Sequence, residues 1–182
     1  MKNIIILLLL TSFVSFGQTN LVDIINDATA PLDEADKAGA TVMALNADMN
    51  YYVIKEGSNN MICLADNPEQ KSFNVACYHK SLEPFMARGR ALKKEGKTRG
   101  EIEEIREAEA VEGKLVMPRE PATLYVLSGE TKENANLRWV VYIPWATAES
   151  TGLPLKPMVA GGPWIMFPNK HNAHIMITPP SN

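Results

Sequence analysis

Two short apolar segments flank a polar turn in the stretch MICLADNPEQKSFNVAC, which covers residues 61–77. Residues 61–64 and 73–77 have the composition of strands, and residues 66–69 are a typical turn sequence. If these strands are neighbours, Cys63 and Cys77 can approach each other. The chain contains only these two cysteines, and an even number favours one disulfide in an oxidising compartment.

Two other interpretations of the cysteines are open from sequence. A metal site could use Cys63, Cys77 and His79, but the closely spaced cysteine pair of most zinc sites is missing. A thiol nucleophile is also possible, although no flanking pattern marks one. We predict a structural Cys63–Cys77 disulfide, no metal site and no cofactor.

Strand-like segments continue on both sides of residues 61–77. Residues 41–45 and 51–54 precede it, and with the two cysteine-bearing strands they predict an antiparallel meander. Four more strands are expected later in the chain, at residues 123–127, 137–143, 163–167 and 173–177.

A helical segment separates these two groups of strands. Residues 79–113 predict a helical hairpin, and Thr98-Arg99-Gly100-Glu101 matches a capping box at the start of its second helix. The sequence therefore predicts an α+β fold: a mainly antiparallel sheet with a helical hairpin inserted between two β-rich halves.

Charge is segregated along this hairpin, with basic residues within 88–99 and acidic residues within 101–112. The helix dipoles favour that order, and two adjacent helices with these charges would attract each other. A polyanion-binding patch is the alternative, but no aromatic residues are interleaved to stack bases. The formal net charge of −3 also gives no reason to expect nucleic acid, so we predict no nucleic-acid partner.

The N-terminus predicts export. Residues 1–17 have one positive charge, an apolar run and small residues at Ser15 and Gly17, as in a secretory signal peptide cleaved before Gln18. The run is too short for a membrane span of about 20 residues. We therefore expect residues 18–182 to form a single α+β domain in the periplasm or outside the cell, with no membrane span after cleavage.

No motif of a known catalytic class occurs in the chain. It lacks the Gly-x-Ser-x-Gly elbow, the His-Glu-x-x-His motif, a phosphate-binding glycine loop and a Cys-x-x-Cys pair. Only three histidines are present. We predict no catalytic residues.

The last two strands contain the candidate ligand-binding residues. Because alternate residues of a strand share a face, Trp164 lies with Met166, and His174 lies with Met176. If the strands pair, one imidazole, two thioethers and one indole share a surface, and imidazole with thioethers suits Cu(I). We prefer the other interpretation, in which the methionines fill the core and His174 finds a hydrogen-bond partner at its edge.

Four short segments occur in a characteristic order: Ala40-Thr41-Val42, residues 57–63 (GSNNMIC), residues 161–166 (GGPWIM) and His174-Ile175-Met176. This series resembles a family of uncharacterised bacterial secreted proteins that have a G-x-N…C segment and an H-x-M ending. Where such proteins often have Pro-His-x-Met, this chain has residues 144–147 (PWAT). The resemblance implies export and supplies no activity.

We therefore expect an exported domain that is a non-enzymatic binding or envelope-associated protein with an unknown partner. The alternative is a small periplasmic enzyme or a copper- or metal-handling protein that uses His174 and its neighbouring methionines. An apolar cleft with His174 on its wall and a convergent carboxylate would favour the alternative. A buried His174 that is hydrogen-bonded to the backbone would favour the binding protein.

Overall fold

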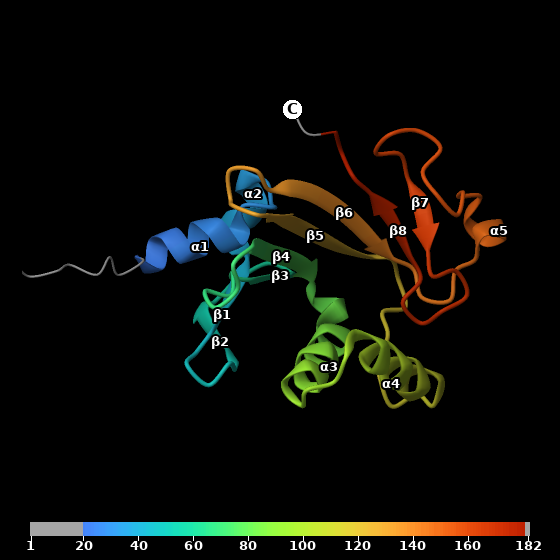
Figure 1. The fold of residues 1–182 in the computed structure, drawn as a ribbon, viewed down its shortest axis with the longest axis horizontal. Helices are drawn as coiled ribbons and strands as arrows, with labels where there is room; N and C mark the ends of the chain where they lie inside the picture. Colours follow the sequence, from blue (N-terminus) through green and yellow to red (C-terminus); the bar gives the residue numbers. More distant parts are fainter. Residues whose placement is uncertain (1–19, 181–182) are drawn as a thin grey trace, which may run out of the picture.

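A computed structural model describes residues 20–180, which form one eight-stranded sheet with five α-helices (Figure 1). The strand order is β2-β1-β3-β4-β5-β6-β8-β7. The predicted α+β class is confirmed, and so is the helical hairpin between two groups of strands. The predicted signal peptide lies outside the described residues.

The strands and the two helices of the hairpin fall close to the predicted ranges. The strands are β1 (Thr41–Leu45), β2 (Tyr51–Lys55), β3 (Met61–Leu64), β4 (Phe73–His79), β5 (Ala122–Gly129), β6 (Asn136–Tyr142), β7 (Trp164–Met166) and β8 (His174–Ile177). The helices are α1 (Leu21–Thr29), α2 (Glu34–Gly39), α3 (Glu83–Lys94), α4 (Arg99–Val111) and α5 (Ala148–Thr151), with a 3-10 turn at Lys80–Leu82 before α3.

The predicted N-terminal meander is wrong, because β1 and β3 are parallel neighbours and β2 forms the edge of the sheet. After β2, the chain crosses the start of β1, where the Ser58 and Asn59 amides donate to the Gly39 carbonyl at 2.8 and 3.0 Å. A Cβ at Gly57 would lie 2.3 Å from the Thr41 backbone nitrogen. Only glycine permits so close a crossing, which places β3 on the far side of β1.

The two β-rich halves join into one sheet where β4 and β5 pair in antiparallel fashion, from Phe73 opposite Gly129 to Tyr78 opposite Leu124. The α3–α4 hairpin leaves the sheet at the end of β4 and folds beneath it (Figure 1). The helices therefore interrupt the sequence of strands without interrupting the sheet.

Alternation along β4 gives the sheet two apolar faces. Cys77 lies in a buried cluster with Ala28 of α1, whereas its neighbour Tyr78 lies in a second cluster with Leu82, at the start of the helical hairpin. Successive strand residues point to opposite faces, so α1 covers one face and the helical hairpin covers part of the other.

The predicted disulfide is confirmed. Cys63 and Cys77 are directly opposite partners on β3 and β4, they form a disulfide, and both side chains are fully buried. Because the described residues include no free cysteine, thiolate metal ligation and a thiol nucleophile do not fit this structure.

The segregated charges of the hairpin face each other, as predicted. The Arg88 guanidinium donates to the Glu109 carboxylate at distances from 2.7 to 3.0 Å, which links α3 to α4. Arg90 donates to Glu83 at 2.6 Å and to the Tyr78 hydroxyl at 2.9 Å, which ties α3 to β4. Part of the basic run therefore takes part in tertiary packing.

Within residues 20–180, no helix is both long and apolar enough to cross a membrane.

Candidate functional site

The four candidate ligand-binding residues come together on one face of the β7–β8 pair. Trp164 is opposite Met176, and Met166 is opposite His174. This confirms the predicted pairing of the strands and their register. His174 is buried, while the two methionines and Trp164 are half-buried.

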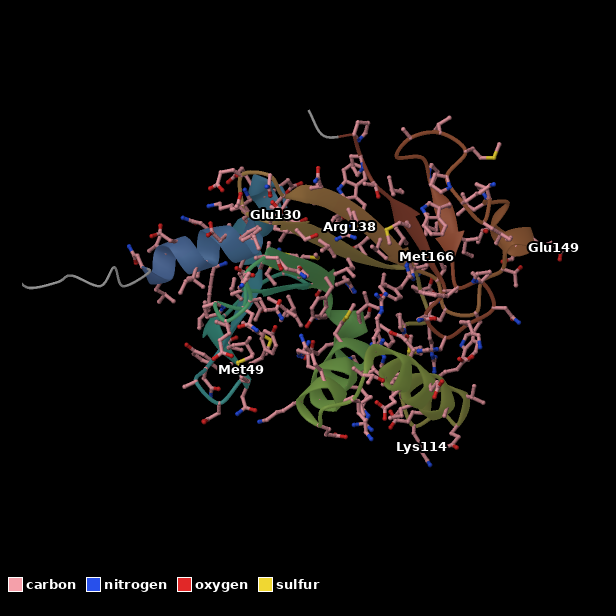
Figure 2. The ribbon with its side chains drawn as sticks, in the orientation of Figure 1. Met49, Lys114, Glu130, Arg138, Glu149 and Met166 are labelled. Atoms are coloured by element: carbon pink, nitrogen blue, oxygen red, sulfur yellow. A yellow bond between two sulfur atoms is a disulfide. The ribbon has the colours of Figure 1, made fainter. Side chains whose placement is uncertain are left out.

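This face opens into a cavity of about 230 Å³ between the sheet and α4, here called the sheet–helix groove. Figure 2 shows two of its residues, Arg138 on β6 and Met166 on β7, on the sheet above the α3–α4 hairpin. Trp164 is not part of the lining. The lining side chains are Phe85, Arg99, Glu103, Arg106, Leu124, Val126, Arg138, Val140, Tyr142, Met166, Phe167, Asn172, His174 and Met176.

His174 combines the two alternatives left open by the sequence. It is 7% exposed, and its Nδ1 lies 2.7 Å from the carbonyl oxygen of Asn172. Because a carbonyl only accepts, Nδ1 carries the proton and Nε2 keeps its lone pair. Burial lowers the pKa of His174 below its ordinary value, so the ring is neutral at pH 7. The ring also lines the groove, between Tyr142 and Phe167 at centroid distances of 5.1 and 5.8 Å.

The connection between β7 and β8, residues 167–173, is fixed to α4 by two side-chain pairs one helical turn apart. Asn172 Nδ2 donates to Glu103 at 2.7 Å, and Lys170 Nζ donates to Glu107 at 2.6 Å. Positions i and i+4 share a helix face, so α4 holds the connection along a single edge. These contacts close the end of the groove beside His174.

Glu103 is the convergent carboxylate of the site. It accepts from Arg106 Nη2 at 2.5 Å as well as from Asn172. Arg106 is 8% exposed, and its guanidinium lies 3.8 Å from the centre of the Phe85 ring. The Glu103 charge is therefore balanced by a buried cation, and that cation is held by an aromatic face.

His171 lies behind the groove wall and is 1% exposed. Both its ring nitrogens lack a hydrogen-bond partner, and Nε2 is 4.0 Å from Glu103 Oε2. The ring packs against Phe85 and Trp145 at centroid distances of 5.8 and 6.5 Å. Burial is the main cause that lowers the pKa of His171, so a neutral imidazole fills this space.

Unusual backbone conformations gather at the same end of the groove. Trp145, Phe167 and Asn169 have φ values of 67°, 50° and 63°, in the left-handed region. Asparagine tolerates this conformation, but bulky residues such as Trp145 and Phe167 seldom adopt it, and such strain is concentrated at functional sites. The Asn169 amide donates to Ala146 at 2.7 Å, and the Trp145 amide donates to Lys170 at 2.8 Å, so the two strained segments hold each other.

The groove is mainly apolar on the sheet side and positively charged at its exposed margins. Val126, Val140 and Met176 form part of the apolar surface, whereas Arg99 and Arg138 are exposed. Burial raises the pKa of Tyr142 to about 12, so its hydroxyl stays protonated at neutral pH. No lining side chain is a serine, threonine, cysteine or lysine. The groove can hold a ligand by apolar contact and ion pairing, but it offers no aliphatic hydroxyl, thiol or amine as a nucleophile.

Sequence reasoning found the strand residues of the groove but missed Glu103, Arg106 and Arg138. The first two belong to a run of charges that resembles a solvated helix face. Glu103 contacts Asn172 in the β7–β8 connection and Arg106 packs on Phe85 of α3, and local sequence reveals neither contact. Arg138 shares a face with Val140 by strand alternation, and that signal could have placed it beside the last strands.

A wider hollow of about 470 Å³ lies near the start of β5, lined by His79, Ser81, residues 118–121 and Thr123. His79 Nδ1 accepts from the Ser81 amide at 3.3 Å and lies 2.8 Å from Ser81 Oγ. This local pair caps the 3-10 turn, so both side chains have a structural role there. We regard the smaller groove as the better candidate, because polar groups from three elements and the β7–β8 connection converge there on an apolar surface.

Comparison of the chain with models of protein families, with curated proteins and with solved structures finds no match. Within the described part of the chain, no three His, Cys, Asp or Glu side chains are grouped as ligands of one metal ion. The functional inference therefore depends on the groove alone.

Proposed function

We propose that this chain is an exported, non-enzymatic protein that binds a small ligand in the sheet–helix groove. The observation that carries the proposal is the composition of the groove: an apolar sheet surface with a few polar side chains at one end and at the margins. Small-molecule sites commonly combine these features. The volume of about 230 Å³ suits a ligand smaller than most drugs.

The polar groups of the groove support binding over catalysis. Glu103 is engaged by Arg106 and Asn172, so its lone pairs are already used in holding the groove wall. The free Nε2 of His174 has no serine, threonine, cysteine or lysine of the groove lining to activate.

Export is supported by the N-terminal sequence and by the buried Cys63–Cys77 disulfide, which is typical of oxidising compartments. Mature protein isolated from the periplasm or the medium should begin at Gln18, as read by N-terminal sequencing and intact mass. A mature chain that keeps residues 1–17 would contradict export with cleavage at Gly17.

Ligand binding in the groove is tested by filling it. Val126 lines the groove, whereas Leu127, the next residue of β5, points to the opposite face of the sheet. We expect calorimetry to show that 1-octanol binds the wild type with a dissociation constant of about 1 mM, a modest value for nine heavy atoms. Val126→Phe should abolish this binding, and Leu127→Phe should preserve it.

Circular dichroism must first show that both variants are folded. Equal octanol binding by the two variants would mean that the ligand does not enter the groove. Absence of octanol binding to the wild type would count against the proposal itself.

Copper handling is the second candidate, favoured by the state of His174. Metal-bound histidines usually donate their other ring N–H to a carbonyl or carboxylate, as His174 does to Asn172. Nε2 is then the free ligand atom, with Met166 directly opposite and Met176 two residues along the strand. Competition with a chromogenic Cu(I) chelator should show uptake that His174→Gln removes. No competition by the wild type would exclude this candidate.

A further inference from the structure

We infer that the ligand of the sheet–helix groove is a small amphipathic organic anion, with a carboxylate or similar acidic group on an apolar body. This inference rests on the proposed function, because it names the chemical class of ligand for the same groove. It follows from the balance of charge along the lining and from the position of the apolar surface.

The charges of the groove do not cancel. Three arginines, Arg99, Arg106 and Arg138, line it against one carboxylate, Glu103. Glu103 is already bound by the buried Arg106. Among the described residues, neither Arg99 nor Arg138 pairs with a carboxylate, and Arg138 donates only to the neutral hydroxyl of Ser128, at 2.6 Å. Two guanidinium groups are thus left to attract an anion.

The two arginines come from opposite sides of the groove. Arg99 is the first residue of α4, and Arg138 lies on β6, next to the β8 strand that contains Met176. Guanidinium groups bind carboxylates through charge-assisted and often bidentate hydrogen bonds. An acidic group near the margin could therefore be held from the helix side or from the sheet side.

The apolar part of the ligand has its own surface. Val126, Val140, Met166 and Met176 are contiguous on β5, β6, β7 and β8, on the face that Arg138 shares. Methionine adapts to ligands of irregular shape. Octanoate has the required chemistry and a size suited to the cavity, so it is the probe that we choose.

The test compares octanoate with two analogues of equal chain length, the neutral 1-octanol and the cationic octylammonium, by calorimetry at low salt. We expect octanoate to bind at least ten times more tightly than 1-octanol, and octylammonium to bind most weakly, because charge-assisted contacts favour the anion. The double variant Arg99→Gln/Arg138→Gln should lose this preference and bind octanoate and octanol alike. Arg119→Gln, which removes an exposed arginine outside the groove, should retain it.

The possible failures are distinguishable. If octanol or octylammonium binds as tightly as octanoate, or if the double variant keeps the preference, the ligand class is wrong while groove binding stands. If none of the three probes binds the wild type, the inference and the proposed function both fail.

Discussion

Glu103 is the residue on which the groove wall depends. It joins a buried arginine of its own helix to Asn172 in the β7–β8 connection. Its neighbour one turn later, Glu107, makes only an exposed pair with Lys170. The two glutamate side chains are similarly exposed, at 35% and 31%, but the cation that pairs with Glu103 is buried and the one that pairs with Glu107 is exposed.

We expect Glu103→Gln to lower the free energy of unfolding by about 2 kcal/mol or more, because Arg106 would stay buried without its counter-charge. Glu107→Gln is the matched control and should cost less than about 1 kcal/mol, as exposed pairs do. Urea denaturation measures both values. If the two variants lose the same free energy of unfolding, then Glu103 does not stabilise the buried Arg106.

Met176 is expected to behave as a groove residue rather than a core residue. It is half-buried, whereas Ile165 on the adjacent strand is 1% exposed. Truncation of a fully buried aliphatic side chain costs about 2–5 kcal/mol. Ile165→Ala should fall in that range, and Met176→Ala should cost clearly less. A Met176→Ala cost as large as that of Ile165→Ala would place Met176 in the core.

At the scale of elements, the β7–β8 connection is the part of the fold that builds the site. It places His171 behind the wall, holds Asn172 against α4 and orients His174 through the Asn172 carbonyl. Its short length made the pairing of β7 and β8 predictable from sequence. Its docking on α4 was not predictable, because the contacts join residues more than sixty positions apart.

The connection should make the stability of the protein depend on pH. Burial lowers the pKa of His171 and of His174 below the ordinary value of 6.5. The unfolded chain therefore binds protons near pH 6.5 while the folded chain does not. We expect the free energy of unfolding to decrease as the pH falls below about 6.5, until the pH passes the lowered pKa values.

His171→Leu should reduce the decrease in the free energy of unfolding at low pH, because it removes one of the two buried imidazoles. It also replaces unpaired nitrogens with an apolar group. Urea denaturation at several pH values between 7 and 5 measures the change. A pH dependence identical to that of the wild type would mean that His171 is hydrated or charged in the folded protein.

Sequence patterns predicted elements better than their arrangement. Alternation and helical spacing located the strands and the hairpin, and the capping box at Thr98 and Glu101 is present as predicted. The parallel pairing of β1 and β3 was missed, because it depends on the close crossing at Gly57 rather than on the strands themselves. The strand residues of the groove were likewise predictable from alternation, whereas its α4 residues were not, because their position depends on contacts between distant parts of the chain.

In the molecule as a whole, the two faces of the sheet have different roles, one in stability and one in ligand binding. One face packs against α1 over the Cys63–Cys77 disulfide, and the other carries the helical hairpin and the groove. The disulfide links adjacent strands on the side away from the groove. Stability and ligand binding are therefore expected to be separable.

The double variant Cys63→Ala/Cys77→Ala should lower the free energy of unfolding by about 2–5 kcal/mol, through the loss of a buried cross-link. Below its melting temperature, this variant should still bind octanol, because the groove lies on the opposite face. Non-reducing peptide mapping of the wild type should recover the linked pair. Unchanged stability in the double variant would contradict a structural role for the disulfide.

Entry of a ligand into the sheet–helix groove should change the surroundings of the methionine methyl groups that line it. Met166 and Met176 line the groove, whereas Met158 is 81% exposed in the loop before β7. We propose to label the methionine methyl groups with carbon-13 and to record their spectrum during titration with octanoate. The Met166 and Met176 resonances should shift in a saturable way while Met158 stays in place. Saturable shifts at Met158 alone, or no shift at Met166 and Met176, would contradict the account.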